Sequence, residues 1–407
     1  MKKIKRAYKF RITPTQEQLA MLLQWVGNTR FVYNLLLRKN MDQYKEDGTF
    51  ILAHQMTTSL PLLKEEYSFL KLSPSQSLQF VARCLDKALK DSFGKNKGFP
   101  RFKSKRKQRD SLTIFQAFSV EKQAIKVPKL GHISLKKHRA IKGKIKHITI
   151  SRSGNHWYCF IYTETKAMAK EKKYVSLIGV DMGIKTFVAC SDGTVVANPR
   201  ILTTYQEQLA FQQKQLSKKK IGSRNREKQK KKVRKIYNKI TNTRKDFQHK
   251  VSHDMITKYD GVMLEDLHIS GMIKNKKLAK HIADASWHEF VRMLEYKAQW
   301  QDKVYITIGR FEPTSKTCSA CGWVDAELCL SDRIFECQIC SLVLDRDLNA
   351  ALNIRNKGLE KLPRDARDVK LVELVSLQTA KSWLAVNQES KNVKALTQVR
   401  FSRSHSF

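Results

Sequence analysis

Acidic residues and long apolar runs are what this sequence has least of. Its 407 residues include 37 Asp and Glu against 78 Lys and Arg, so the formal net charge is +41. Such a chain repels itself until a polyanion neutralises it, and contacts with nucleic-acid phosphates do so by releasing counterions. No apolar run approaches the roughly 20 residues that cross a bilayer. The composition therefore favours a nucleic-acid partner and argues against a membrane.

A secretory signal is also missing from the opening segment. "MKKIKRAYKFRI" is charged, and no apolar region follows it. We therefore expect a cytoplasmic protein whose thiols are reduced. Of eight cysteines, Cys84, Cys159 and Cys190 lie singly in apolar surroundings and are expected in the core. The other five lie between residues 318 and 340.

The first hundred residues predict one strand followed by a helical module. "KRAYKFRIT" alternates as a strand does, and the apolar residues after it recur at helical spacing. Thr13 is the predicted N-cap, with Pro14 in the first helical position and Gln16 completing a capping box. A helix-turn-helix within this module stays open, because two amphipathic helices with a turn between them are a weak signal.

A basic stretch and then a β-rich segment follow. Seven of the thirteen residues 97–109 are Lys or Arg, and Phe99 and Phe102 lie among them. Short alternating segments then continue to about residue 165 and predict antiparallel strands in a small barrel or curled sheet. Most charge runs are solvated faces, but the aromatics and the overall charge favour nucleic-acid binding here.

From residue 174 the pattern becomes α/β. "YVSLIGV", "TFVAC" and "GVMLEDL" predict buried strands, and "KVYITIG" predicts a further strand. Residues 203–258 predict long helices with a break near "IGSRN". Residues 215–250 hold fifteen Lys or Arg and two acids. Repulsion between so many like charges destabilises a helix unless phosphates lie nearby.

The cysteine-rich segment has the spacing of a zinc ribbon. In "CSACGWVDAELCLSDRIFECQIC", two Cys-x2-Cys pairs are separated by fifteen residues. Two such pairs on tight turns supply four thiolates in tetrahedral geometry and close the coordination shell, so the ion would be structural. The predicted ligands are Cys318, Cys321, Cys337 and Cys340. A redox disulfide pair or an iron–sulfur cluster is the alternative, and Cys329 is expected to be a bystander.

Three carboxylates fall where buried elements end or begin. Asp181 ends one strand, Glu265 ends another, and Asp347 begins the helix in "DLNAALNI". A buried carboxylate is costly unless it is paired or bound to a metal, so three of them suggest one cluster that holds hard cations. Two Mg²⁺ ions bridged by carboxylates can activate water and stabilise the leaving oxygen of a phosphodiester. Taken singly, each could instead be an ordinary turn residue.

Neighbouring acids leave this assignment open at two positions. In "LED", alternation allows only one of Glu265 and Asp266 to point inward. In "DRD", Asp345 could cap the helix, and spacing alone does not choose between it and Asp347. Asp192 in "SDG" is expected in a hairpin turn.

Several motifs occur in an order that resembles the TnpB family. These are "GVDMGIKTFVACSDGT", "LEDLHISGM", "CSACG…CQIC" and "DRDLNAALNI". TnpB proteins are RuvC-like proteins encoded by insertion-sequence transposons and related to type V CRISPR effector nucleases. "YKFRITPTQEQ", "GFPRFKSKRK" and "SWHEFVRMLEYKA" extend the resemblance from residue 4 to about 356. Any one motif alone would be weak, whereas the ordered set is specific.

The resemblance implies an α/β fold plus all-β and helical parts. It implies a RuvC/RNase H-like domain with an inserted zinc ribbon, an N-terminal β-barrel wedge and a helical recognition module. The expected domains are the first wedge strand at 1–12, the helical recognition module at 13–95, the wedge β-barrel at 96–170, the first part of the nuclease domain at 171–317, the zinc ribbon at 318–340, the last nuclease helix at 341–360 and a flexible tail at 361–407.

The resemblance also implies an activity. The family binds a guide RNA derived from the transposon end and cleaves complementary double-stranded DNA beside a short transposon-adjacent motif. By motif position, Asp181, Glu265 and Asp347 would be the catalytic ligands of two Mg²⁺ ions, and the family pattern favours Asp347 over Asp345. One Zn²⁺ would sit at the four cysteines.

Basic runs at 97–109, 218–250 and 274–280 are the expected contacts with the nucleic-acid backbone. The residues singled out are Arg101, Lys103, Lys105, Arg106, Lys107, Lys230, Lys231, Lys232 and Arg234. Three other functions stay open. A strand-transfer transposase would use the same three acids. A catalytically idle RNA-guided repressor would not need them, and a plain zinc-ribbon DNA-binding protein would leave them unexplained.

Overall fold

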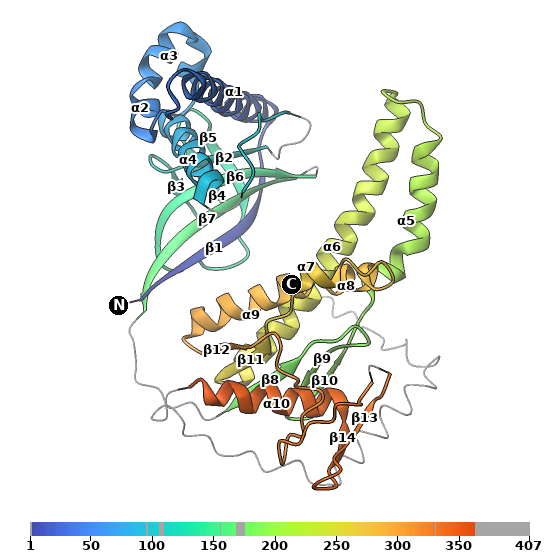
Figure 1. Cartoon of the computed structure of the whole chain (residues 1–407). Coiled ribbons are helices and arrows are strands. Elements are labelled where there is room, and N and C mark those ends of the chain that lie inside the picture. Colours follow the sequence, from blue (N-terminus) through green and yellow to red (C-terminus); the bar gives the residue numbers. More distant parts are fainter. Residues whose placement is uncertain are drawn as a thin grey trace. The chain divides into compact units, whose positions relative to one another are not determined.

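The computed structural model describes residues 2–94, 97–105, 110–154, 156–167, 176–329 and 331–362 (Figure 1). The chain divides into two compact units, Met1–Ala169 and Lys170–Phe407. The tail expected at 361–407 lies outside the described residues except for its first two positions. Within the described residues, no helix is both long and apolar enough to cross a bilayer.

The helices of the first unit pack around a long helix, α1. The helical elements are α1 (Gln16–Asp47), α2 (Ala53–Thr58), α3 (Leu60–Glu66), the 3₁₀ helix η1 (Ser68–Leu72) and α4 (Ser75–Gly94). Buried side chains such as Val32, Leu36 and Leu85 form their common core. The predicted helical module is therefore present.

The predicted N-cap of α1 is wrong. Thr13 is the last residue of strand β1 (Lys2–Thr13) and pairs with Ser134 in the sheet. Thr15 caps the helix instead: its hydroxyl accepts the Gln18 N–H at 3.3 Å, and Gln18 Oε1 accepts the Thr15 N–H at 3.1 Å. Both Thr13 and Thr15 are followed three residues later by Gln, so either could form a capping box. The pairing of Thr13 in the sheet decides that the box forms at Thr15.

The β-rich part of this unit is one antiparallel sheet. Its strands, after β1, are β2 (Ser111–Ile114), β3 (Ser119–Val120), β4 (Ala124–Val127), β5 (Gly131–Lys136), β6 (Lys144–Ser153) and β7 (His156–Ala167). Their hydrogen-bonded order is β2-β6-β7-β1-β5-β4-β3. Buried residues of the sheet, among them Phe10 and Ile148, form one cluster with Trp25 of α1. The predicted antiparallel sheet is confirmed, and its closure into a barrel stays a prediction.

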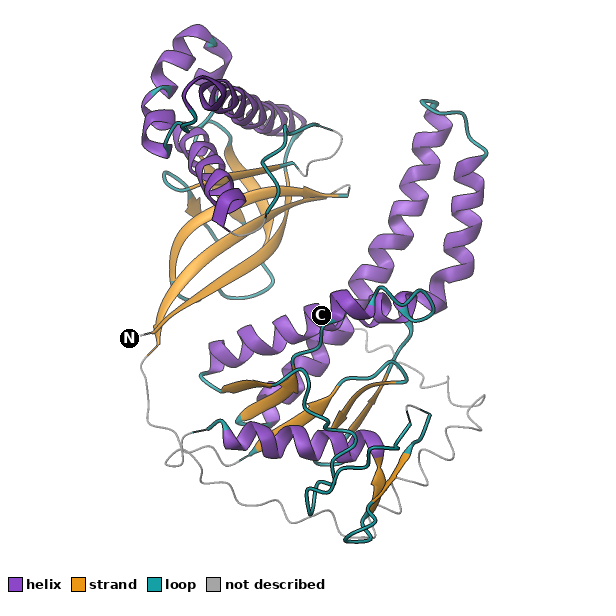
Figure 2. Ribbon diagram, viewed as in Figure 1, coloured by secondary structure: helices purple, strands orange, loops and turns teal. Residues whose placement is uncertain are grey.

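The second unit is built on a mixed five-stranded sheet (Figure 2). Its strands are β8 (Leu177–Asp181), β9 (Thr186–Cys190), β10 (Val195–Ala197), β11 (Gly261–Glu265) and β12 (Val304–Ile308), in the order β10-β9-β8-β11-β12. β8, β11 and β12 run parallel, whereas β9 is antiparallel to both of its neighbours. The three predicted buried strands are thus β8, β9 and β11, and the further predicted strand is β12, in which only Ile308 is buried.

Helices cover both faces of this sheet. The helices of this unit are α5 (Ile201–Ser217), α6 (Arg224–Lys258), α7 (Ile269–Met272), α8 (Ala279–Ala285), α9 (Trp287–Gln301) and α10 (Arg346–Glu360). Side chains of α6, α8 and α9 pack on one face, against Ile178, Val180 and Leu264. Ile354 of α10 packs on the other face, against Leu177 and Met263. α5 and α6 form a long hairpin whose turn lies at the predicted break (Figure 1).

Gly179 allows α10 to lie directly on β8. A Cβ atom at this position would stand 2.6 Å from the Arg355 backbone nitrogen and would collide with the Ala351 carbonyl oxygen. Neither obstacle is a flexible side-chain end, so any larger residue would force the helix away from the strand. Alternation along β8 places Gly179 on the same face as Asp181, two residues further on.

We predict that Gly179→Ala lowers the free energy of unfolding by at least about 1–3 kcal/mol, because the added methyl overpacks the contact between α10 and β8. Amide hydrogen exchange in α10 should accelerate in the same variant. Gly27→Ala is the matched control, since Gly27 lies in helix α1 and a Cβ there would meet nothing within 4 Å. Equal stability of the two variants would contradict the close contact.

Candidate active site and metal centre

Two carboxylates leave the sheet at the same edge. β8 and β11 are parallel, with Val180 opposite Leu264, so Asp181 and Glu265 follow in register as the last residues of their strands. Asp266 is directed elsewhere: its carboxylate pairs with the Arg310 guanidinium at 2.7 Å. Of the two acids in "LED", Glu265 is therefore the one that faces the cavity described below.

The third carboxylate is brought in by α10. Asp345 caps this helix, because its Oδ1 accepts the N–H groups of Asp347 at 2.8 Å and of Leu348 at 3.3 Å. Asp347 lies in the first helical turn and faces the same cavity as Asp181 and Glu265. The structure thus separates the two acids of "DRD" into a helix cap and a cavity residue.

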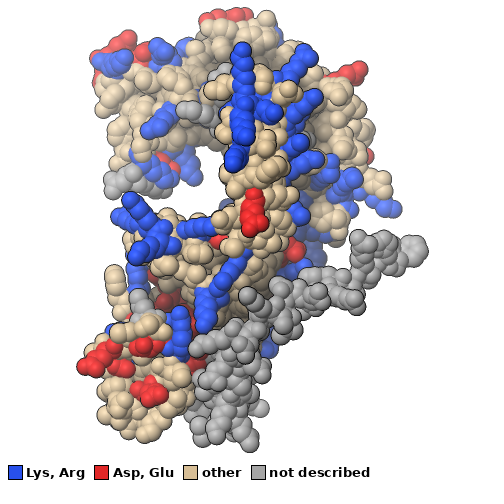
Figure 3. All heavy atoms as spheres, turned by 90° about the vertical axis from the view of Figure 1, so that its right-hand side faces the viewer, with Lys and Arg blue, Asp and Glu red and all other residues tan. Residues whose placement is uncertain are grey.

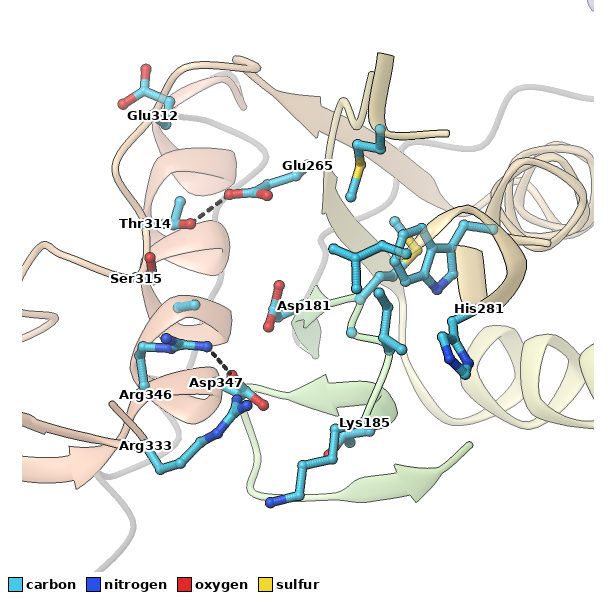
Figure 4. Close-up of a pocket in the computed structure, with 18 of the residues that line it drawn as sticks. Asp181, Lys185, Glu265, His281, Glu312, Thr314, Ser315, Arg333, Arg346 and Asp347 are labelled. Atoms are coloured by element: carbon cyan, nitrogen blue, oxygen red, sulfur yellow. Dashed lines mark hydrogen bonds and ion pairs between the residues drawn. The ribbon is translucent and has the colours of Figure 1, made fainter. Parts of the chain in front are cut away.

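The three acids line a cavity of about 840 Å³ (Figure 4). Asp181 lies between Glu265 and Asp347 in this view. The cavity is also lined by cationic or titratable side chains, namely Lys185, Arg200, His281, Arg310, Arg333 and Arg346. The acids at the centre could bind metal cations. The basic side chains around them could attract a polyanionic substrate.

Burial and mutual repulsion hold the central acid protonated in the absence of cations. Burial, followed by the charges of Asp347 and Glu265, raises the pKa of Asp181 to about 8. Burial also raises the pKa of Glu265, although the Thr314 hydroxyl bond opposes the shift. The pKa of Asp345 rises to about 6, chiefly through burial and then through Asp347. A divalent ion between these groups would reverse this penalty.

The three carboxylates are more widely spaced than a single-ion cage would need. Among the described residues, only the four-cysteine group has three or more potential ligand atoms that all lie within 4.8 Å of one another. Glu265 is turned toward Thr314, whose hydroxyl donates to Glu265 Oε1 (Figure 4). Two ions about 3.5–4 Å apart would span a wider set of ligands than one ion does.

The four predicted cysteines form a compact cluster. The sulfur atoms of Cys318 and Cys340 are 3.6 Å apart, and those of Cys321 and Cys337 are 3.5 Å apart. Tetrahedral zinc with Zn–S bonds near 2.3 Å places its sulfurs about 3.8 Å apart, so the group fits Zn²⁺. Gly322 has φ of +81°, which lets the loop turn back after the first pair. Cys329 lies outside the cluster, as expected.

The cluster is fastened to the helix that bears Asp347. β13 (Ile334–Glu336) and β14 (Val343–Asp345) form a hairpin that leads directly into α10. Arg346 Nη1 donates to the Cys329 carbonyl at 3.1 Å, and the Arg346 N–H donates to the Arg333 carbonyl at 2.8 Å. The ribbon thereby brings Arg333 to the cavity wall.

The predicted nucleic-acid contacts differ in their exposure. Arg101, Lys105, Lys231, Lys232 and Arg234 are exposed. On the α5–α6 hairpin, exposed Lys and Arg side chains gather on the face shown in Figure 3. Lys230 is only partly exposed, and its ammonium pairs with Glu227. Arg106 and Lys107 lie outside the described residues.

Lys103 lies differently from the other singled-out cations. Its Nζ is 3.6 Å from the centre of the Tyr33 ring, and burial lowers its pKa. Its backbone N–H donates to Asn34 Oδ1 at 2.8 Å, and its carbonyl accepts from Asn34 Nδ2 at 3.0 Å. These contacts fasten the basic stretch to α1, so a phosphate contact by Lys103 stays a prediction.

Several cavity residues escaped sequence reasoning. Arg333 lies in the segment between the cysteine pairs, where no motif marks it. Thr314 precedes the first cysteine pair in a polar run that gave no separate signal. Arg346 lies between the two acids of "DRD", and only its position next to Asp347 could have suggested it.

Three family models match successive parts of the chain. One described as "Probable transposase" matches residues 160–276, which include Asp181 and Glu265. One described as "Cas12f1-like, TNB domain" matches residues 287–354, which include the cysteine cluster and Asp347. One described as "Helix-turn-helix domain" matches residues 1–49.

Curated relatives include two that cover most of the chain and one that covers about a third of it. A protein of Streptomyces pristinaespiralis, provisionally named an RNA-guided DNA endonuclease, is 34% identical over 366 residues and spans 88% of this chain and 90% of its own length. InsQ of Escherichia coli (strain K12), with the same provisional name, is 32% identical over 372 residues, 87% of this chain and 92% of InsQ. TnpB-like protein L79 of Acanthamoeba polyphaga mimivirus is 29% identical over 146 residues, 34% of this chain and 28% of L79. The chain belongs to the TnpB family.

The fold of this TnpB-family chain is also found in a solved structure. The Cas12f1 chain of a cryo-EM complex with sgRNA and target DNA has a TM-score of 0.57 at 15% identity, over 87% of this chain and 99% of that chain. In the part matched by the helix-turn-helix model, residues 2–49 of the structure contain β1 and the continuous helix α1.

We predict that Cys318→Ser removes the bound zinc and loosens the ribbon, because three thiolates leave the coordination shell open. The measurement is zinc per chain by elemental analysis, together with amide exchange in residues 316–345. Cys329→Ser is the control and should keep its zinc. Normal zinc content in Cys318→Ser would contradict the four-cysteine site.

We predict a pH signature of Asp181 in protein without added divalent ions. The folded state binds this proton more tightly than the unfolded state, whose pKa is near 3.9, so stability falls as pH rises from about 4 to about 8. Asp181→Asn should therefore be more stable than wild type at pH 8.5 and nearly equal to it at pH 4. Urea unfolding at both pH values tests this, and a difference that does not grow with pH would refute it.

Proposed function

We propose that this chain is a Mg²⁺-dependent, RNA-guided DNA endonuclease with a RuvC/RNase H-like catalytic centre. The observation that supports it is the cavity at one edge of the mixed sheet, which is lined by Asp181, Glu265 and Asp347 together with Lys and Arg side chains. The relatives in Streptomyces and E. coli that are provisionally named RNA-guided DNA endonucleases support the same activity. We assign the three acids as ligands of two Mg²⁺ ions.

The chemistry would be hydrolysis of one phosphodiester bond. Two bound Mg²⁺ ions would activate the attacking water and stabilise the leaving 3′ oxygen. Asp181, buried between the other two acids, would give up its proton as the cations bind, which the raised pKa makes sensitive to pH. Arg333, Arg346 and Lys185 would bind the phosphates of the strand in the cavity.

The basic surfaces would hold the nucleic acids. Guide pairing would read the DNA sequence, so the protein needs charge along the RNA–DNA duplex more than base-specific contacts. The exposed cations of the α5–α6 hairpin and the stretch at 97–105 are the proposed backbone contacts. We propose a guide RNA derived from the transposon end and recognition of a short DNA motif next to the target. Co-purifying RNA can be sequenced to test the first of these.

Strand transfer is the second candidate, since one matching model is described as a transposase. Hydrolysis and strand transfer differ only in the attacking oxygen, which belongs to water in one and to a DNA 3′ hydroxyl in the other. Incubation of the RNA complex with guide-matched duplex and Mg²⁺ separates them. Cut ends without joined products indicate hydrolysis, whereas joined strands indicate transfer.

We predict that Asp181→Asn and Glu265→Gln abolish cutting of guide-matched DNA but leave RNA and target binding within about threefold of wild type. Loss of a metal ligand removes the ions while the basic surfaces remain. Asp266→Asn is the matched control, because Asp266 adjoins Glu265 and pairs with Arg310 rather than facing the cavity. It should cut normally. A parallel loss of binding and cutting in Asp181→Asn would instead indicate a structural role.

A further inference from the structure

Thr314 is hydrogen-bonded to Glu265 at the wall of the cavity. Its side chain is almost fully buried, with 7% exposed, and its hydroxyl donates to Glu265 Oε1. Figure 4 shows the two side chains directed toward each other at the wall of the cavity. Thr314 itself lies in an irregular segment between β12 and the first cysteine pair, so other contacts must hold it in place.

Two buried asparagines of α10 hold this segment. Asn353 Nδ2 donates to the Thr314 carbonyl at 2.8 Å and to the Thr317 carbonyl at 2.6 Å. Asn349 Nδ2 donates to the Thr317 carbonyl at 2.7 Å, and Asn349 Oδ1 accepts the Ser319 N–H at 3.0 Å. The two asparagines are four residues apart and therefore lie on the same face of the helix.

We propose that Thr314 is a positioning residue for the cation site, and that Asn349 and Asn353 couple it to the cysteine cluster. Residues 314–319 then connect Glu265 at one end with Cys318 at the other, through hydrogen bonds to the helix that also bears Asp347. This inference rests on the proposed function, since it assigns Glu265 as a cation ligand. It adds a residue that acts through Glu265.

The physical reason lies in the freedom of a glutamate side chain. Glu265 has three rotatable bonds, and ordering such a side chain costs on the order of 1–2 kcal/mol, so without a partner it would not stay in one geometry. The Thr314 hydroxyl donates to Oε1, so Oε2 is the oxygen that would bind a cation. Groups that orient metal ligands in this way typically change metal affinity 10–100-fold when removed.

The test measures Mn²⁺ binding to the full-length, zinc-loaded protein by electron paramagnetic resonance, with Asp181→Asn defining binding outside the site. We expect Thr314→Val to weaken Mn²⁺ binding about 10–100-fold and Thr314→Ser, which keeps the hydroxyl, to stay within about threefold of wild type. Thr317→Val is the matched control. The Thr317 hydroxyl donates to the Pro313 carbonyl at 2.8 Å within the same segment, so its loss should leave Mn²⁺ binding nearly unchanged.

A second variant tests the coupling through α10. Asn353→Ala should weaken Mn²⁺ binding in the same direction as Thr314→Val. The double variant should be no weaker than the weaker single variant, because both act on one contact. Additive losses would refute the coupling.

The remaining outcomes separate the positioning role from its alternatives. Wild-type Mn²⁺ affinity in Thr314→Val would overturn it. Equal weakening in Thr317→Val would also overturn it, since general loosening of the segment would then explain both losses. Wild-type protein that binds Mn²⁺ in a Thr314-dependent manner but leaves guide-matched DNA uncut would refute the endonuclease function while supporting the positioning role.

Discussion

The direct contact of α10 with β8 is the constraint on which the cavity depends. Because Gly179 has no side chain, the backbone of the helix lies against the strand. One helix then brings Asp347 to the strand ends that bear Asp181 and Glu265, and its two asparagines hold the loop that contacts Glu265. The register of β8 and β11 places Asp181 and Glu265, and the seating of α10 on the sheet places Asp347 beside them.

Charge in the second unit is arranged with acids inside and bases outside. Partial burial and the repulsion of its neighbours show in the high pKa of Asp181. Such a group is stabilised only by protons or by cations. The surrounding Lys and Arg, part of a chain with net charge +41, attract the polyanion. The acids would bind protons or cations, and the Lys and Arg side chains would bind the polyanion. Without its ligand, either set of like charges would destabilise the fold through repulsion.

Much of this arrangement could be predicted from the sequence, because local patterns fixed it. Buried strands ending in an acid located Asp181 and Glu265, and paired cysteines at fixed spacing located the ribbon. The N-cap of α1 was predicted wrongly because Thr13 and Thr15 carry the same local signal. Only the pairing of Thr13 in the sheet leaves Thr15 as the cap. Arg333 and Thr314 were missed because only the folded chain brings them to the cavity wall. Lys103 was grouped with surface cations, although its ammonium lies over an aromatic ring.

The chain order of the three acids has a consequence during synthesis. Asp181 lies in the first strand of its sheet, whereas Asp347 lies in the last described helix, so the ribosome adds 166 residues after Asp181 to reach Asp347. At roughly 5–20 residues per second, a ribosome needs on the order of ten seconds or more to add them. Throughout that interval the nascent polypeptide lacks α10, which packs on the Gly179 face of β8, and lacks the third acid. The cavity is therefore completed late in translation.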